Sequence, residues 1–106
     1  MLRIHETVLM LVREVAPIAV AIERRDGDLA KQLRRALSSV TLNIAEGGAQ
    51  RGARRASHYS IALGSAREAW SAIRTAEAWG YCALPSEGVI DRFDHVMATL
   101  YVNANR

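Results

Sequence analysis

Cysteine and proline are scarce in this sequence of 106 residues, and each shortage excludes a class of protein. The single Cys82 cannot form a disulfide framework, so we expect a reducing, cytoplasmic environment. With two prolines, seven glycines and half of its residues apolar, the chain is neither fibrous nor disordered. No apolar run approaches the roughly 18 residues of a membrane span, and no signal peptide is recognisable. The length suits a single domain, 1–106.

Motifs for catalysis and for metal binding are also missing. Cys82 and the serines lack a nucleophile signature such as Gly-x-Ser-x-Gly, and no glycine-rich phosphate loop is present. The three histidines, His5, His58 and His95, have neither ligand spacing nor the Glu-x-x-His pairs of di-metal bundles. We therefore expect no enzymatic activity, no cofactor and no metal ion.

Four stretches of helical periodicity predict an all-α fold with helices at about 4–24, 28–47, 53–80 and 86–103. The connections are short, which favours an antiparallel up-down four-helix bundle. Apolar residues three or four positions apart mark the expected core: Ile4, Val8, Leu11, Val15, Ile18 and Ile22, then Leu33, Leu37, Val40 and Ile44, then Tyr59, Leu63, Ala66, Trp70 and Ile73, and finally Ile90, Phe93, Met97 and Leu100.

The predicted helix ends depend on a few capping residues. Gly27 suits a left-handed cap after the first helix, and Asp28 is placed to cap the second. Ser86 is expected to cap the fourth helix. Gly47 and Gly64 are small enough to let neighbouring helices approach closely, Gly64 beside a face of alanines.

The second and third predicted helices carry polar residues beside their apolar faces. The residues that could meet between these helices are Ser39, Asn43, Glu46, Ser65 and Glu68. Three interpretations remain open: a solvated or satisfied polar seam, a polar network that fixes the register of subunits, and a small-molecule or metal site.

Positive charge is concentrated in one quarter of the chain. The formal net charge is +3, yet residues 31–55 alone carry +5, because six basic residues face only Glu46: Lys31, Arg34, Arg35, Arg51, Arg54 and Arg55. Such a patch can attract a polyanion, and arginine is suited to phosphate. Arg34, Arg51, Arg54 and Arg55 are the candidate nucleic-acid contacts. No base-reading motif is present, so binding would go through the backbone of RNA or DNA.

Apolar residues exceed what one core stripe per helix requires. The first helix is apolar at Leu9, Val12 and Val20 beside its stripe, and Ile61 and Trp79 lie off the core side of the third. We expect a second buried face, and hence a homo-oligomer.

Residues 38–47, which read Ser-Ser-Val-Thr-Leu-Asn-Ile-Ala-Glu-Gly, resemble the signature of four-helix-bundle proteins encoded in 23S rRNA intervening sequences. Relatives of that family include the accessory variability determinant (Avd) proteins of diversity-generating retroelements. Gln-Leu-Arg-Arg-Ala at 32–36, Ala-Leu-Gly-Ser-Ala-Arg-Glu at 62–68 and Trp-Gly-Tyr at 79–81 resemble flanking family blocks. The sequence departs at Thr41, where many members have proline, and at His58-Tyr59, where a phenylalanine-rich start is common.

The resemblance implies a non-catalytic cytoplasmic protein that assembles as a cyclic homopentamer. It also implies a basic surface that contacts nucleic acid and, in the retroelement relatives, a reverse transcriptase. The family's motif residues map to Asn43, Glu46, Ser65 and Glu68, with a structural role. The alternative hypotheses are a homo-oligomeric scaffold that binds a partner protein, and a small-molecule or metal site in the polar seam.

Overall fold

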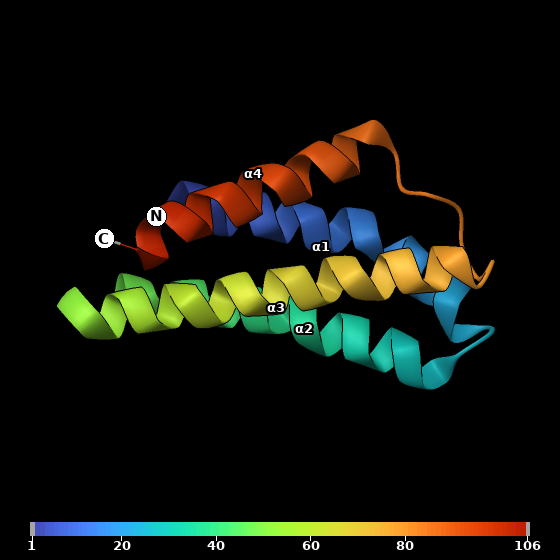
Figure 1. Ribbon diagram of the computed structural model, residues 1–106, viewed down its shortest axis with the longest axis horizontal. Coiled ribbons are helices and arrows are strands. Elements are labelled where there is room, and N and C mark those ends of the chain that lie inside the picture. The colour runs from blue at the N-terminus through green and yellow to red at the C-terminus, as the bar shows by residue number, and fades with distance from the viewer. Residues whose placement is uncertain (1, 106) are drawn as a thin grey trace.

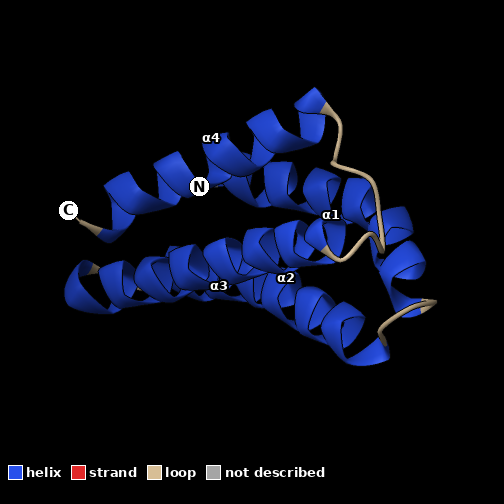
Figure 2. Ribbon diagram, turned by 45° about the vertical axis from the view of Figure 1, so that its right-hand side comes forward, coloured by secondary structure: helices blue, strands red, loops and turns tan. Residues whose placement is uncertain are grey.

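The fold is all-α, as the sequence predicts. The computed structural model describes residues 2–105, and within them all regular structure lies in four helices, α1 (Leu2–Glu23), α2 (Gly27–Gly48), α3 (Gly52–Ala78) and α4 (Glu87–Ala104), with no strand (Figures 1 and 2). Every helix begins and ends within two residues of its predicted bounds. Among the described residues, none of the helices is both long and apolar enough to span a membrane.

Each connection reverses the direction of the chain, so that consecutive helices run in opposite senses (Figure 1). α2 packs against α1 and α3, α4 packs against α1 and α3, and the α2–α3 pair is the most extensive. The molecule is elongated, with extents of 42 × 25 × 19 Å. The α2–α3 connection therefore lies at one end of the long axis, and the α1–α2 and α3–α4 connections lie at the other (Figure 1).

One continuous core fills the space between the helices, and most of the predicted apolar stripes contribute to it. The third helix differs from its prediction, because its alanine face is buried (Ala62, Ala69, Ala72 and Ala76) while Trp70 is only partly buried. Small alanine side chains let α2 and α3 approach closely over their length. The stripe of α4 is rotated slightly, since Val89 and Val96 are buried, whereas Ile90 and Met97 are half-buried.

Two predicted caps at the α1–α2 connection are wrong, and the one predicted for α4 is correct. Asp26 caps α2, because its side chain accepts a hydrogen bond from the backbone N–H of Leu29 at 3.0 Å. Gly27 is the first residue of α2 and has no left-handed conformation, which within residues 2–105 occurs only at Gly52 and Gly80. Ser86 caps α4 by accepting from the Val89 N–H.

The two glycines expected at close helix contacts differ in their surroundings. Gly47 is buried, and a Cβ atom there would lie 2.6 Å from Cε1 of Tyr59, so the tyrosine ring of α3 packs directly on the α2 backbone. Gly64 is exposed, and a Cβ atom would meet nothing within 4 Å. The predicted close helix contact at Gly64 is therefore not formed between the helices of a single chain. The residue lies on the solvent side of α3 and not beside the buried alanines.

Candidate functional site

Three arginines gather at the end of the molecule where α2 turns into α3. Arg51 is the N-cap residue of α3, and Arg54 and Arg55 lie in the first turns of this helix. All three are exposed. The side chain of Arg51 makes no capping hydrogen bond, so the first backbone N–H groups of α3 add a partial positive charge beside the arginines. We call Arg51, Arg54 and Arg55 the arginine cluster.

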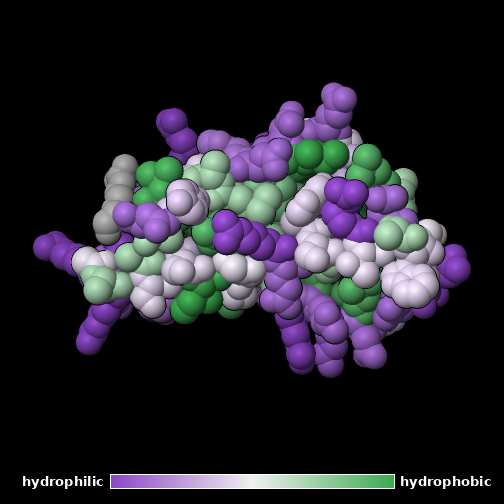
Figure 3. All heavy atoms as spheres, viewed as in Figure 1, coloured by the Kyte–Doolittle hydropathy of each residue, from purple (hydrophilic) through white to green (hydrophobic). Residues whose placement is uncertain are grey.

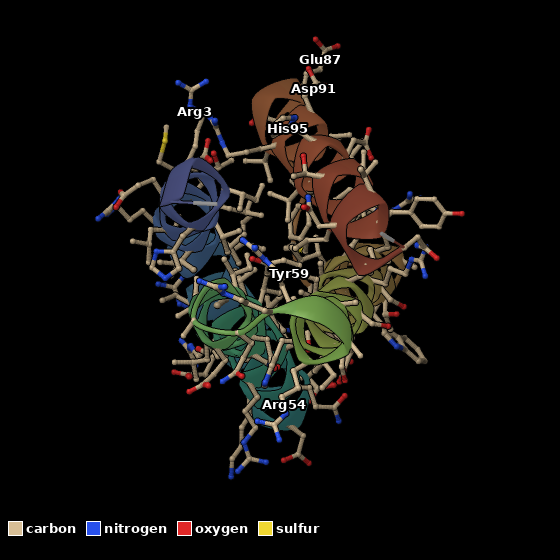
Figure 4. All side chains as sticks on the ribbon, turned by 90° about the vertical axis from the view of Figure 1, so that its left-hand side faces the viewer. Arg3, Arg54, Tyr59, Glu87, Asp91 and His95 are labelled. Carbon is tan, nitrogen blue, oxygen red and sulfur yellow. The ribbon has the colours of Figure 1, made fainter. Side chains whose placement is uncertain are left out.

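Arg55 is held in position by a buried tyrosine. Its Nε donates a hydrogen bond to the Tyr59 hydroxyl at 3.3 Å, and its guanidinium lies 5.7 Å from the centre of the Tyr59 ring. Tyr59 is 1% exposed and packs on Gly47, so it provides a rigid support for the arginine. Figure 4 views this end of the molecule: Tyr59 lies in the middle, and Arg54 points outward at the edge.

Arg34, the fourth predicted contact, does not belong to this cluster. It forms an exposed ion pair with Glu23 at the end of α1. Fourteen residues separate it from Gly48, the last residue of α2. At 1.5 Å per residue that is about 21 Å along the helix. The basic segment 31–55 is therefore divided between two ends of α2, and a single chain brings only three of the four predicted arginines together.

Acidic residues lie on the opposite side of the molecule from the arginine cluster. Glu87, Asp91 and Asp94 are exposed on α4, and Figure 4 places Glu87 and Asp91 at the edge opposite Arg54. Figure 4 places Arg3 and His95 near the same edge, so this side carries both signs of charge. The three carboxylates nevertheless lie away from the arginine cluster, where they would not oppose a bound polyanion.

The polar seam between α2 and α3 consists of four hydrogen-bonded side chains. Ser65 donates to the Ser39 hydroxyl at 2.9 Å, and the Asn43 amide nitrogen donates to the Ser39 backbone carbonyl at 2.9 Å. Asn43 Oδ1 lies 3.1 Å from Nδ1 of His58. Because an amide oxygen can only accept, His58 carries a proton on Nδ1.

The membership of this seam corrects the sequence-based prediction. Ser39, Asn43 and Ser65 take part, whereas Glu46 and Glu68 are exposed and make no side-chain hydrogen bond or ion pair among the described residues. His58 was not expected there. The spacing could have found it, because His58 and Ser65 lie seven residues apart, on one face of α3.

The seam is satisfied by its own members. Within residues 2–105, no buried polar side-chain atom lacks a hydrogen-bond partner. In the same range, no three His, Cys, Asp or Glu side chains are placed to hold a metal ion. The hydrogen bonds of the seam join α2 to α3 and thereby support the helix turn that presents the arginine cluster.

Apolar side chains remain uncovered on the single chain. Leu42 is 66% exposed and Ile61 is 50% exposed, and Met10, Val20, Tyr101 and Val102 are also exposed. Figure 3 shows green hydrophobic patches that reach the surface among the purple side chains. A groove of about 240 Å³ between α1 and α2 is lined mainly by aliphatic side chains, among them Val12, Ala16 and Val20.

The fold and the site together define a small all-α protein with an arginine cluster at one end, a satisfied polar seam and uncovered apolar surface. The family model described as 23S rRNA-intervening sequence protein matches residues 2–101. The chain therefore belongs to the 23S rRNA-intervening sequence protein family. Comparison with curated proteins and with solved structures gives no significant match.

Proposed function

We propose that this chain is a non-catalytic, homo-oligomeric nucleic-acid-binding protein of the cytoplasm that contacts the RNA or DNA backbone through the arginine cluster. The observation that carries the proposal is the placement of Arg51, Arg54 and Arg55 on one exposed helix start, away from the exposed carboxylates of α4. Guanidinium groups bind phosphate oxygens through paired hydrogen bonds, and a helix start adds a favourable field.

Homo-oligomerisation is the second part of the proposal. The exposed apolar residues and the apolar groove between α1 and α2 supply surface that a second copy would cover. We propose a cyclic homopentamer of antiparallel up-down bundles, the assembly that the motif resemblance implies. Five copies multiply the net charge of +3 and bring several arginine clusters onto one particle. Separate phosphate contacts then act together on one nucleic-acid molecule.

The proposal covers RNA and DNA alike, because the family description names an intervening sequence of 23S rRNA and no ligand. The resemblance to Avd proteins adds a reverse transcriptase as a candidate partner. Neither source indicates a base sequence, and the arginine cluster lies on an exposed helix start without a base-reading motif. Binding would therefore depend on phosphate geometry, with little discrimination among sequences.

The test is a binding measurement over a salt series, made on the full chain with a 20-base-pair RNA duplex and a DNA duplex of the same length. We expect affinity to fall steeply with salt. Replacing Arg51, Arg54 and Arg55 with alanine removes three charges per chain. The plot of the logarithm of the association constant against the logarithm of the salt concentration has a negative slope. Its magnitude would then decrease by about 2.7 for each chain whose three arginines all contact phosphate.

A matched control removes the same number of charges from other places on the surface. Arg13, Arg24 and Arg67 are exposed and form no ion pair among the described residues, so their joint replacement by alanine changes net charge equally. We expect a smaller loss of affinity in this variant. Equal losses in the two variants would contradict a localised site, and absent or salt-insensitive binding of the wild type would contradict phosphate contact.

The uncovered apolar surface favours one alternative function, a homo-oligomeric scaffold that binds a partner protein. In that case a partner would remain bound after nuclease treatment and after replacement of the arginine cluster. The salt series separates the two functions, because a scaffold whose charge serves only solubility has no affinity for either duplex.

A further inference from the structure

An exposed tryptophan stands at the far end of α3, remote from the arginine cluster. Trp79 is 68% exposed, more than any other large apolar side chain described. It is the C-cap residue of α3, and its backbone N–H donates to the Thr75 carbonyl at 3.0 Å. α3 has 27 residues and is therefore about 40 Å long, so Trp79 and the arginine cluster occupy opposite ends of the molecule.

A second aromatic ring adjoins this tryptophan, and an arginine lies against that second ring. The rings of Trp79 and Tyr81 are nearly parallel, at 14°, with centroids 6.2 Å apart. The guanidinium of Arg25, in the connection between α1 and α2, lies 5.4 Å from the centre of the Tyr81 ring. Gly80 adopts a φ of 80°, which returns the chain so that the Tyr81 N–H reaches the Ala76 carbonyl at 2.9 Å. We call Trp79, Tyr81 and Arg25 the Trp79 platform.

The backbone that carries the two aromatic rings is held by hydrogen bonds. Tyr81 is half-buried and packs against the core, and Trp79 belongs to the last hydrogen-bonded turn of α3. Stacking on Tyr81 also favours one orientation of the exposed indole ring, so less conformational entropy is lost when a flat partner binds. This arrangement differs from the groove between α1 and α2, which is lined mainly by aliphatic side chains.

A shallow depression adjoins Trp79 along α3. Its volume is about 500 Å³, and its walls are Ser71, Arg74, Thr75, Ala78 and Trp79. The two hydroxyls can donate or accept hydrogen bonds at the edge of a ligand. Arg74 pairs with Glu77 at 3.5 Å on the surface, a contact too weak to prevent it from reaching a phosphate.

We propose that the Trp79 platform binds an unpaired nucleobase of a single-stranded RNA or DNA segment. Bases stack on aromatic side chains without regard to sequence, and arginine beside the ring attracts the attached phosphate. Arg25 lies against Tyr81, and Arg74 lines the depression beside Trp79 and pairs with Glu77, so these three side chains carry one net positive charge that complements a nucleotide. The inference rests on the proposed nucleic-acid binding and adds a second class of contact, to bases, at the opposite end from the arginine cluster.

The experiment measures binding of the full chain to 12-nucleotide oligouridylate, 12-nucleotide oligothymidylate and the 20-base-pair RNA duplex. Trp79→Ala removes the platform, Trp79→Phe keeps an aromatic face, and Leu84→Ala removes another exposed apolar side chain near the same end as a control. We expect Trp79→Ala to weaken binding to the single strands by about 5- to 100-fold. Duplex binding should change less than about twofold, and Trp79→Phe should retain most of the affinity.

Intrinsic fluorescence gives an independent reading. The chain has two tryptophans, and Trp70 is partly buried against Phe93, with ring centroids 5.2 Å apart. Stacking of a base on Trp79 should quench the emission, and the quenching should disappear in Trp79→Phe. A third titration uses 12-nucleotide oligodeoxyuridylate, which has the same base as oligouridylate. Half-maximal quenching at a lower concentration of oligouridylate than of oligodeoxyuridylate indicates RNA as the source of the base, and the reverse order indicates single-stranded DNA.

The outcomes separate this inference from the proposed function. If Trp79→Ala and Leu84→Ala bind single strands equally well and duplex binding still depends on salt, the Trp79 platform does not bind bases. The proposed phosphate contact of the arginine cluster is then unaffected. Quenching at Trp79 without any duplex binding supports base binding by the Trp79 platform. It overturns the proposal that the arginine cluster binds the nucleic-acid backbone. A change in native mass caused by Trp79→Ala, with unchanged single-strand affinity, assigns the tryptophan to a contact between copies and overturns the inference.

Discussion

Replacing Gly47 with alanine would place a methyl group against a buried aromatic ring. The added Cβ would lie 2.6 Å from Cε1, 2.9 Å from Cδ1 and 3.1 Å from Cζ of Tyr59. Tyr59 is 1% exposed, so its ring cannot turn away without disturbing the α2–α3 contact. Overpacking of this kind costs about 1–3 kcal/mol. The substitution also gains up to about 1 kcal/mol of helix propensity, so the clash must be measured against a variant with the same gain.

Gly48→Ala is that variant, because Gly48 is adjacent in α2, exposed, and has nothing within 4 Å of a Cβ position. We expect Gly47→Ala to unfold about 1–3 kcal/mol more easily than Gly48→Ala, which corresponds to a melting midpoint roughly 4–15 °C lower. Thermal unfolding followed by circular dichroism at equal protein concentration measures this difference. In a Tyr59→Leu background the difference should shrink, because the ring atoms are gone. A Gly47→Ala protein that melts at or above Gly48→Ala would refute the packing argument.

Three further predictions concern stability and reactivity. Gly64→Ala should raise the free energy of unfolding by about 0.5–1 kcal/mol in urea titrations, because its surroundings are open, and a loss of stability would show a contact absent from one chain. Asp26→Ala should cost about 0.5–2 kcal/mol by removing the cap on Leu29, and an equal loss in Asp28→Ala would contradict this assignment. Burial, and to a smaller extent the Glu77 carboxylate, raise the pKa of the Cys82 thiol, so its alkylation by iodoacetamide should reach half-maximal rate at a higher pH than that of free cysteine. Glu77→Gln should lower this midpoint, and an unchanged midpoint would contradict the contribution of Glu77.

Helix number and bounds could be predicted from the sequence because apolar spacing reports helix faces directly. The errors arose where the competing candidates are close in sequence. Asp26 and Asp28 are both good N-caps, and only the backbone at Asp26, extended at φ −155° and ψ 93°, decides between them. In α3 the pattern favoured the large Trp70, whereas the close approach of α2 selects the alanine face for burial.

The arginine cluster could also be predicted, because its three members lie within five residues of one another. The exclusion of Arg34 could not, since its pairing with Glu23 depends on how α1 and α2 pack. The membership of the polar seam likewise depends on helix packing that the sequence does not reveal. Asn43 and Ser65 have complementary small polar groups, but the choice of His58 in place of Glu46 and Glu68 depends on the rotation of α2 against α3.

The central claim is that several chains assemble and bring their arginine clusters onto one nucleic acid. Native mass spectrometry of the full chain with the 20-base-pair RNA duplex, at low ionic strength, tests it most directly. The account predicts a complex of five chains, each of 11.7 kDa, with bound duplex, and predicts that alanine at Arg51, Arg54 and Arg55 leaves five chains without RNA. A single chain of 11.7 kDa, with or without RNA, would contradict the account.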